Sequence, residues 1–265
     1  MTVATTIGGT TLLEAVAEVA RRAGDVALRH FRSGISVEWK SDGSPVTIAD
    51  REAERAAREW IERRFPDDGI LGEEQGETRG TAVRRWIVDP IDGTKSFVRG
   101  VPLWGTLVGV AEGDSILAGA AYFPAIDELV AAAPGRGCWW NGAACRVSQV
   151  SSIAEATVLT TDERFPDDRR RRDGWRELAS RAAVSRTWGD CFGYLLVATG
   201  RAEVMVDDRM NAWDAAAILP IIGEAGGVFT NWSGAVTAFG GSAIATNAVL
   251  ARDVRVTLNA DAPHA

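Results

Sequence analysis

Residues 86–97 read Trp86-Ile87-Val88-Asp89-Pro90-Ile91-Asp92-Gly93-Thr94-Lys95-Ser96-Phe97, and this stretch carries the most information about the fold. The short, apolar, β-branched run at 85–88 predicts a buried strand that ends at Asp89. Asp92 follows after a turn that contains proline, so both carboxylates can converge on one site. Gly93 and Thr94 then open the next segment, where the backbone N–H groups of a helix start would favour a phosphate.

Paired carboxylates of this kind suit hard divalent cations. Magnesium prefers carboxylate oxygens, carbonyl oxygens and water as ligands, and paired metal ions favour in-line attack on a phosphoryl group. The simpler alternative is that Asp89 and Asp92 are turn and N-cap residues, which is the commoner role of aspartate in such a setting. The spacing of the pair alone leaves both interpretations open.

The first half of the chain predicts helices followed by a sheet. Apolar residues recur with helical spacing over 12–31 and 50–64, and the second helix carries Glu/Arg pairs on its other face. Between them, the Ser-, Gly- and Pro-containing stretch 40–45 predicts an exposed loop. Three apolar segments separated by turn residues predict a meander of antiparallel strands: 104–112, 115–123 and 127–133.

Beyond about residue 150, short strand candidates alternate with helical stretches, which predicts α/β layering with some parallel pairing. The strand candidates are 157–161, 203–207 and 243–246. The helical stretches are 175–182, 194–200, 247–259 and 213–225, the last with a kink at Pro220. The arginine run 169–172 predicts a solvated loop or a helix entry. We therefore expect an α+β protein whose two subdomains, 1–150 and 151–265, share one interface that holds the site.

Composition disfavours several classes of function. A formal net charge of -7 and a pI near 5.0 work against a nucleic-acid partner or an anionic membrane, because either needs a basic face. Three cysteines without a CxxC pair predict neither a disulfide framework nor a zinc ribbon. Since no signal-peptide or membrane-spanning pattern is visible, we expect a soluble, cytoplasmic protein. With only two histidines, carboxylates must carry the chemistry.

Three motifs make the metal interpretation specific. The string from Asp89 to Thr94 resembles the DP(I/L)DGT signature of the inositol monophosphatase superfamily. Two further motifs of that family lie in the expected order: Gly72-Glu73-Glu74 upstream, and Trp213-Asp214-Ala215-Ala216 running into Gly223-Glu224-Ala225-Gly226-Gly227 downstream. The resemblance covers nearly the whole chain. It implies a layered α/β/α/β/α sandwich, a magnesium-dependent phosphomonoesterase acting on a small phosphorylated metabolite and, commonly, a homodimer.

The resemblance also implies roles for the matched residues. Two or three magnesium ions would share five residues: Glu73, Asp89, Ile91 through its carbonyl, Asp92 and Asp214. Asp89 would serve the first two ions, and Glu73 would hold the third, weaker one with water. Magnesium would activate a water molecule for direct attack, so no histidine base or phosphoenzyme is expected.

Other matched positions would orient the reactants. Thr94, paired with Asp50 on the early helix, would orient the attacking water, and Glu73 would assist in catalysis. The phosphate of the substrate would contact the segment that contains Asp92, Gly93 and Thr94.

The stretches 92–104 and 188–194 resemble, more narrowly, the histidinol-phosphate phosphatases of this superfamily. Histidinol phosphate carries an ammonium and an imidazole, so its site should offer carboxylates or carbonyls. Asp190 is the main candidate, with Arg186 and Asn211 as weaker ones; the alternative for Asp190 is an N-cap. An inositol-1-phosphate or fructose-1,6-bisphosphate phosphatase is the alternative enzyme, and a catalytically idle regulatory homologue is the alternative from another class.

Three residues beside the motifs have two interpretations each. Glu74 either orients a metal ligand or is a surface acid. Lys40 either approaches the phosphate or is a solvated lysine. The position of Trp213 next to Asp214 favours a role in core packing over contact with the substrate.

Overall fold

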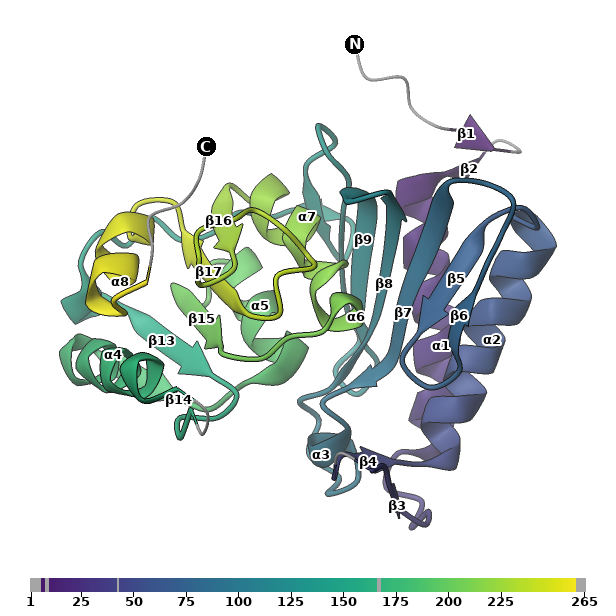
Figure 1. The fold of residues 1–265 in the computed structure, drawn as a ribbon, viewed down its shortest axis with the longest axis horizontal. Helices are drawn as coiled ribbons and strands as arrows, with labels where there is room; N and C mark the ends of the chain where they lie inside the picture. Colours follow the sequence, from purple (N-terminus) through teal and green to yellow (C-terminus); the bar gives the residue numbers. More distant parts are fainter. Residues whose placement is uncertain (1–5, 8–9, 42, 166–167, 261–265) are drawn as a thin grey trace.

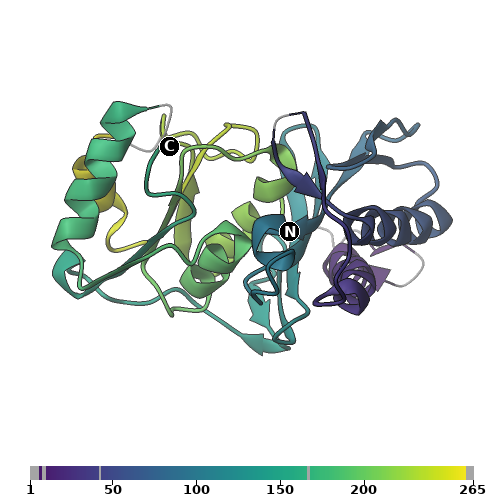
Figure 2. The same cartoon turned by 90° about the horizontal axis from the view of Figure 1, so that it is seen from below.

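The computed structural model describes residues 6–7, 10–41, 43–165 and 168–260, and within them the chain forms five layers (Figure 1, Figure 2). One outer layer consists of helices α1 (Leu12–His30) and α2 (Ile48–Arg64). The middle helix layer contains α5 (Asp190–Ala198), α6 (Ala212–Ala215) and α7 (Ile218–Glu224), and the other outer layer contains α4 (Arg169–Arg181) and α8 (Ala251–Thr257). One sheet lies on each side of the middle layer. The predicted α+β class and layered sandwich are therefore confirmed.

The larger sheet lies between the first helix layer and the middle one. Its strand order is β12-β11-β10-β9-β8-β7-β5-β6. The strands are β5 (Gly69–Gly72), β6 (Gly76–Thr78), β7 (Arg84–Asp92), β8 (Gly105–Glu112), β9 (Ser115–Phe123), β10 (Glu128–Ala132), β11 (Cys138–Trp140) and β12 (Ala143–Ala144). Strands β7 to β10 are antiparallel neighbours, so the predicted meander is confirmed, whereas β5 joins β7 in parallel. The sequence does not predict the shortest strands, because such short pieces carry no clear periodicity.

Alternation along the strands of this sheet assigns side chains to the two helix layers. Trp86 and Val88 of β7 belong to the core under α1 and α2, whereas Ile87 belongs to the core shared with α5 and α7. Because side chains alternate across a strand and both faces are covered by helices, β7 is apolar on both sides from Trp86 to Val88, directly before Asp89.

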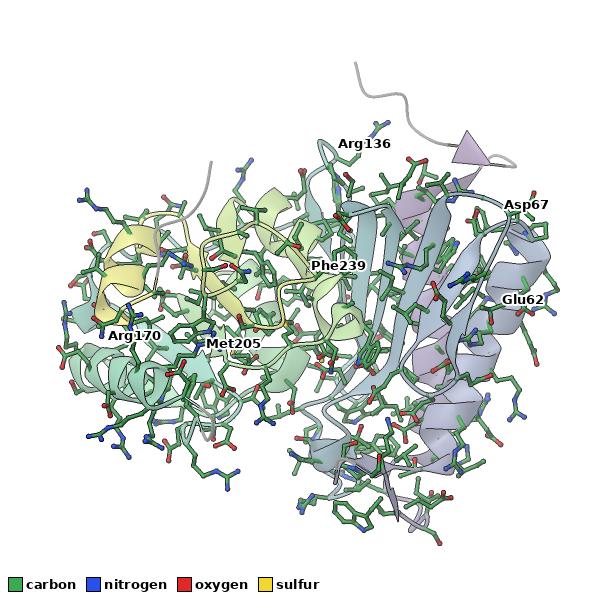
Figure 3. The ribbon with its side chains drawn as sticks, in the orientation of Figure 1. Glu62, Asp67, Arg136, Arg170, Met205 and Phe239 are labelled. Atoms are coloured by element: carbon green, nitrogen blue, oxygen red, sulfur yellow. The ribbon has the colours of Figure 1, made fainter. Side chains whose placement is uncertain are left out.

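The smaller sheet has the order β14-β13-β15-β17-β16. Its strands are β13 (Thr157–Thr160), β14 (Val184–Arg186), β15 (Val204–Asp207), β16 (Gly227–Thr230) and β17 (Ala243–Asn247). Strand β13 pairs in parallel with β14 and β15, and the remaining pairs are antiparallel, so the predicted partial parallel pairing is confirmed. Met205, labelled in Figure 3, packs toward the middle helices, whereas Val204 and Val206 pack toward α4 and α8.

The prediction of one helix over 213–225 with a kink at Pro220 is wrong. The chain instead forms α6 and α7, which are separated at Ala216 and Ala217. Glycines of the larger sheet lie against this break: a Cβ at Gly119 of β9 would lie 2.3 Å from the carbonyl oxygen of Ala217. Pro220 occupies the first turn of α7, where its missing N–H removes no intrahelical hydrogen bond.

The other boundaries differ more modestly. The arginine run 169–172 forms the first turn of α4, which confirms the helix-entry interpretation. Helix α5 begins four residues before the predicted start at 194, and α8 is shorter than predicted. The remaining elements are β1 (Thr6–Ile7), β2 (Thr10–Thr11), β3 (Glu38–Trp39), β4 (Pro45–Val46), α3 (Thr94–Phe97) and the 3-10 helix Ile153–Glu155. Among the described residues, no helix has the length and apolar character required to cross a bilayer.

Candidate active site

Asp89 and Asp92 lie on β7, on either side of a β-bulge. Asp89 pairs with Leu107 of β8 and Asp92 pairs with Gly105, so three residue steps on β7 match two steps on β8. In a regular strand, side chains three positions apart point to opposite faces, and one inserted residue returns them to the same face. Both carboxylates therefore face the middle helix layer.

A third carboxylate reaches them from that layer. Asp214 is the third residue of α6, a helix that packs against β7 and β8. The backbone N–H of Asn211, the N-cap residue, donates to Asp214 Oδ2 at 2.7 Å and fixes the direction of the side chain. Asp89, Asp92 and Asp214 each offer an oxygen atom, and these three atoms lie within 4.8 Å of one another. The structure thus brings together three of the five predicted metal ligands.

Three carboxylates at this separation, with Asp89 buried and Asp92 and Asp214 partly buried, disfavour their own ionisation. Burial, and then the charges of neighbouring carboxylates, raise the pKa of Asp89 and of Asp92 well above the usual range. Burial likewise raises the pKa of Asp214 to about 6. A divalent cation would remove this repulsion, and carboxylate oxygens are its preferred ligands. The donor set therefore fits a metal ion.

Backbone hydrogen bonds hold the loop that carries the pair. The N–H of Ile91 donates to Asp89 Oδ1 at 3.0 Å, and the N–H of Cys191, at the start of α5, donates to Asp92 Oδ2. The carbonyl oxygen of Ile91, the other predicted ligand of this loop, accepts a hydrogen bond from Thr94 Oγ1 at 2.9 Å. A carbonyl oxygen has two lone pairs, so one remains for a cation.

Glu73 lies next to the three aspartates and outside their cluster. It follows β5 directly, and its N–H donates to the carbonyl of Val88, the residue before Asp89. Its carboxylate accepts a hydrogen bond from Lys40 Nζ at 2.8 Å, and Glu74 accepts another from the same ammonium at 2.6 Å. Lys40 is therefore an ion-paired lysine, not a solvated one. The Glu74 side chain is only 6% exposed, so Glu74 is not a surface acid, and its burial raises its pKa to about 7.

Thr94 and Asp50 lie together, as the sequence predicts. Thr94 Oγ1 is 3.5 Å from Asp50 Oδ1, at the long limit of a hydrogen bond. The other oxygen of Asp50 accepts from the backbone N–H and the hydroxyl of Thr47, both at 2.7 Å, in a capping box that begins α2. Burial raises the pKa of Asp50. The hydroxyl of Thr94 thus lies between this carboxylate and the Ile91 carbonyl.

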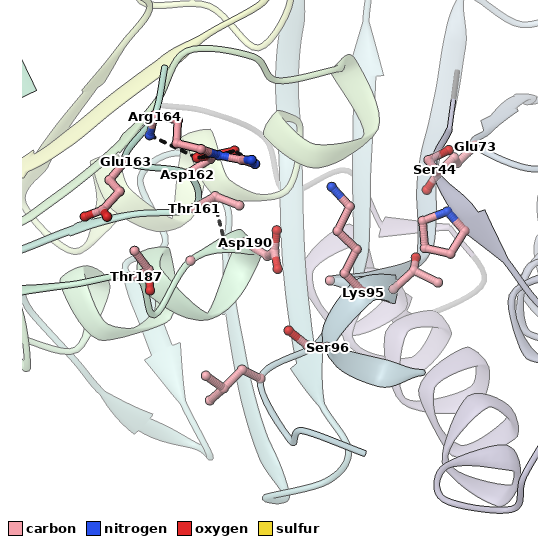
Figure 4. A pocket seen from close by; sticks show the side chains of 15 residues that line it. Ser44, Glu73, Lys95, Ser96, Thr161, Asp162, Glu163, Arg164, Thr187 and Asp190 are labelled. Carbon is pink, nitrogen blue, oxygen red and sulfur yellow. Dashed lines mark hydrogen bonds and ion pairs between the residues drawn. The ribbon is translucent and has the colours of Figure 1, made fainter. Parts of the chain in front are cut away.

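A cavity of about 480 Å³ opens beside these residues, and Figure 4 shows the side chains that line it. The lining comes from the α3 region and from the ends of strands of the smaller sheet, including Lys95, Thr161, Asp162 and Asp190. In Figure 4, Lys95 and Asp190 project into the same space. A second cavity of about 220 Å³ lies next to it, and its lining includes Asp92, Asp190, Asp207 and Asp214.

The side chain of Asp190 faces these cavities. Gly189 is the N-cap residue of α5, and Asp190 makes no capping hydrogen bond with its side chain, so the N-cap alternative is wrong. The Asp190 N–H donates to Thr161 Oγ1 at 2.8 Å, and its backbone has a φ of 51°, a conformation that turns the chain sharply there. Burial and the carboxylate of Asp207 raise the pKa of Asp190 to about 7.

Among the acidic residues that line the cavities, Asp162 and Asp207 are two that the sequence motifs do not mark. Asp162 and Asp207 lie at the carboxyl ends of the parallel neighbours β13 and β15. Asp207 is buried and accepts hydrogen bonds from Tyr194 Oη at 2.8 Å and from the Thr161 N–H at 3.2 Å. The predicted strands 157–161 and 203–207 end near both residues, and the carboxyl ends of parallel neighbours meet at one edge of a sheet, but the sequence does not predict that these two strands are neighbours.

The two weaker candidates lie outside both cavities. Arg186 is exposed, and its guanidinium donates to the Ser185 carbonyl and lies 5.9 Å from the centre of the Trp188 ring. Asn211 is exposed and is the N-cap residue of α6, where its backbone N–H donates to Asp214. Both contribute to local structure, and a substrate contact for either stays a prediction. Trp213 packs against the central core, as its sequence position predicts.

Comparison with known proteins decides the family. The model of the inositol monophosphatase family matches residues 10–262. The chain belongs to this family. A solved structure of an inositol monophosphatase from Thermotoga maritima has a TM-score of 0.84 at 30% sequence identity, and covers 94% of this chain and 96% of its own. The inositol monophosphatase relatives and the layered fold together identify a phosphoric monoester hydrolase.

Curated relatives divide by substrate. A histidinol-phosphatase of Chlorobaculum parvum is 42% identical over 84% of this chain and 86% of its own length. A histidinol-phosphatase of Mycobacterium tuberculosis is 38% identical over 91% of this chain and 95% of its own. A fructose-1,6-bisphosphatase/inositol-1-monophosphatase of Aquifex aeolicus is 32% identical over 81% and 84%. The relatives that are similar to this chain are thus named for at least two different kinds of substrate.

Proposed function

We propose that this family member is a magnesium-dependent phosphatase that hydrolyses L-histidinol phosphate to L-histidinol and inorganic phosphate. The observation that carries the proposal is the position of Asp190, which lines both cavities beside the three-aspartate cluster and projects into the larger one in Figure 4. An ammonium or imidazolium group is the natural partner of such a carboxylate. The histidinol-phosphatase names of relatives up to 42% identical support the same substrate.

Magnesium would be held by Asp89, Asp92 and Asp214, and a second ion by Asp89 with the Ile91 carbonyl and Glu73. A third ion would share Glu73 with water. When bound, magnesium neutralises phosphate charge and lowers the pKa of water at the site. The raised pKa values of the aspartates, which reflect first their burial and then the charges of neighbouring carboxylates, support this assignment.

The chain itself would orient the attacking water. The Thr94 hydroxyl donates to the Ile91 carbonyl in the structure and lies near Asp50, so its lone pairs are available to accept from a water molecule. Asp50, or Glu73 across the cluster, could take up the proton that the water loses. The phosphate would lie against Gly93 and Thr94, where a side chain at Gly93 would lie 2.9 Å from the Leu103 carbonyl.

The leaving group would occupy the acidic cavity. With phosphate at the aspartate cluster, the amino alcohol extends toward Asp190 and Asp162. Asp162 is already paired with Arg164, so of these two carboxylates Asp190 is the one available for the charged end of the substrate. Because the pKa of Asp190 is about 7, a cationic substrate would also favour its ionised form.

One observation favours a second substrate class. The Lys95 side chain projects into the larger cavity, where an ammonium would attract a second phosphate group. Fructose 1,6-bisphosphate carries such a group, and the Aquifex aeolicus relative is named for it. A catalytically idle homologue receives less support, because the chain contains every carboxylate of the expected site.

A substrate panel tests the proposal. Phosphate release is measured in magnesium with L-histidinol phosphate, inositol 1-phosphate, fructose 1,6-bisphosphate and adenosine 3',5'-bisphosphate. Strong preference for L-histidinol phosphate is expected. Comparable rates on several esters would contradict the narrow substrate assignment, and no release from any ester would contradict the phosphatase assignment.

A further inference from the structure

Helix α2 buries a line of charged side chains on the face that packs against the larger sheet. Asp50, Glu54 and Arg58 are spaced four residues apart, so they lie along one side of the helix. The side chain of Glu54 is 0% exposed and that of Arg58 is 7% exposed. By contrast, Glu62 of the same helix is exposed (Figure 3). Sequence periodicity places the Glu/Arg pairs of this helix opposite its apolar face, and for Glu54 and Arg58 that prediction is wrong.

The Glu54 carboxylate holds the turn that contains Glu73. One oxygen accepts the backbone N–H of Glu74 at 2.7 Å, and the other accepts the N–H of Gln75 at 3.1 Å. The Arg58 Nε also donates to Glu54, at 2.8 Å. The two hydrogen bonds that Glu54 accepts from the turn therefore come from Glu74 and Gln75, the two residues that follow Glu73.

Arg58 extends the same clamp to the next strand. Its guanidinium donates to Thr78 Oγ1 at 3.0 Å and to the carbonyl of Gly76, at the two ends of β6. Gly72, the residue before Glu73, packs so closely that an added Cβ would lie 2.2 Å from Glu54 Oε1. The β5–β6 turn thus lies directly on a buried ion pair, with no space for a side chain between them.

A buried ion pair is a poor source of stability, because desolvation of both charges offsets their attraction. Its geometry, however, is highly directional: a guanidinium that donates to three different acceptors and a carboxylate that accepts from three donors allow few alternative arrangements. In this protein, the ion pair fixes the direction of the chain at Glu73. Asp50, one turn earlier on α2, approaches Thr94. One rigid helix therefore touches the supports of both Glu73 and Thr94.

We propose that Glu54 and Arg58 are positioning residues, which act through the β5–β6 turn to hold the Glu73 carboxylate toward the metal site. The inference rests on the proposed function, because it takes Glu73 as a metal ligand. Residues that orient a metal ligand from behind typically change metal affinity by about tenfold to a hundredfold when they are mutated. The same range is expected here for magnesium.

The test is calorimetric titration of Mg²⁺ into metal-free Glu54→Gln in the absence of substrate. Glutamine keeps the size of the side chain, but its NH₂ group cannot accept from a backbone N–H or from Arg58. We expect Mg²⁺ affinity about tenfold or more below that of the unmutated protein. In the activity assay, the magnesium concentration for half-maximal rate should rise by a similar factor, while kcat at saturating magnesium changes much less.

Asp68→Asn provides the matched control. Asp68 forms another buried ion pair of the same sheet: it accepts from Arg84 Nε at 2.6 Å and from Trp86 Nε1 at 2.9 Å. It precedes β5, whereas Glu73 follows β5, so the two lie at opposite ends of that strand. This variant should lose stability and keep its Mg²⁺ affinity. Equal weakening of Mg²⁺ binding in both variants would overturn the proposal, because general destabilisation would then explain it.

Unchanged Mg²⁺ affinity in folded Glu54→Gln would also overturn the proposal. If that variant does not fold, Arg58→Lys decides, because lysine keeps the charge beside Glu54 but cannot form the guanidinium fork to Gly76 and Thr78. Weaker Mg²⁺ binding in this variant supports the proposal, and unchanged binding overturns it. Failure of the proposed function would show itself differently, as absence of magnesium-dependent phosphate release from the unmutated protein.

Discussion

Asp89 and Asp92 lie three positions apart along β7, whereas their pairing partners Leu107 and Gly105 lie only two positions apart along the facing strand β8. The bulge directs both carboxylates to the face where α6 presents Asp214. The cluster that could bind a metal ion therefore depends on a local irregularity of the sheet, with Pro90 at the bulge. The Pro90 carbonyl accepts from Thr106 Oγ1 at 2.8 Å, which fixes the irregular segment against β8.

Asp89→Asn should abolish most activity and stabilise the metal-free protein. Loss of one metal ligand should lower kcat by at least about a hundredfold, since a metal ion contributes several kcal/mol of charge stabilisation. In chelator, removal of one of three repelling carboxylates should raise the melting temperature. Phosphate release and thermal unfolding check the two effects. Asp114→Asn, at an exposed turn, should change neither; full activity in Asp89→Asn would disprove its assignment as a ligand.

Thr94→Val should lower kcat with a smaller effect on KM. Valine keeps the shape but loses the hydroxyl that lies between Ile91 and Asp50, so the attacking water loses its orientation. Groups that handle the reacting proton typically contribute about 10²- to 10⁴-fold. Steady-state kinetics provide the measurement. Thr94→Ser should retain most of the rate, and a serine variant as slow as the valine variant would point to a packing role.

Asp190→Asn should change the preference between substrates more than it changes kcat. Loss of a charge-assisted hydrogen bond in a buried site costs about 1.5–3 kcal/mol, so KM for L-histidinol phosphate should rise by about tenfold or more. The KM for inositol 1-phosphate, which carries no cation, should change little. Competition between the two esters measures the ratio directly. Equal changes for both would show that Asp190 does not contact the leaving group.

Stability of the metal-free protein should fall as pH rises from about 4 to about 7. Asp190 has a pKa of about 7 and Asp214 of about 6 in the folded protein, both above the unfolded value of about 3.9. At pH values between the unfolded and folded pKa, the folded state binds more protons than the unfolded state. The stabilisation is therefore complete below about pH 4 and is lost as pH rises through the folded-state pKa values of about 6 and about 7. Thermal unfolding in chelator across this range measures the slope. Asp190→Asn should have a shallower slope; an identical slope would contradict the assignment to Asp190.

Gly119→Ala should destabilise the contact between the larger sheet and the α6–α7 break. The added Cβ would meet the Ala217 backbone, and overpacking of this kind costs about 1–3 kcal/mol. Gly223→Ala, in α7, has open space around the new methyl group and should stabilise by up to about 1 kcal/mol. Urea unfolding measures both. A neutral Gly119→Ala would show that the two layers can move apart at low cost.

Sequence reasoning finds the chemistry of the site better than its geometry. The string 89–94 and the residues Glu73 and Asp214 can be found because short motifs retain residue type and spacing. The bulge cannot be found that way, since it appears only in the pairing of β7 with β8. Helical periodicity predicts α1 and α2 well but assigns Glu54 to a polar face, because it cannot foresee that a turn of another strand supplies N–H groups to a buried carboxylate.

The cavity residues Asp162 and Asp207 could not be predicted for a similar reason. The strands that end near Asp162 and Asp207 are predicted, but their adjacency in the sheet is not, because strand order depends on contacts distant in sequence. Arg186 is the opposite case, a residue that is predicted near the site but lies outside the cavities. Its position in the chain, close to Asp190, suggests a shared site, but β14 ends at the surface and the Arg186 side chain lies over Trp188.

The most direct test of the metal-dependent phosphatase is a magnesium titration of chelator-treated protein with L-histidinol phosphate as substrate. Asp89, Asp92 and Asp214 form a cluster that could hold a metal ion. The proposed function requires that ion, so phosphate release should be absent in chelator and should rise to saturation as Mg²⁺ is added. Asp89→Asn should remain inactive throughout the titration. Undiminished phosphate release in excess chelator would contradict the account, because hydrolysis would then proceed without a metal ion at the three aspartates.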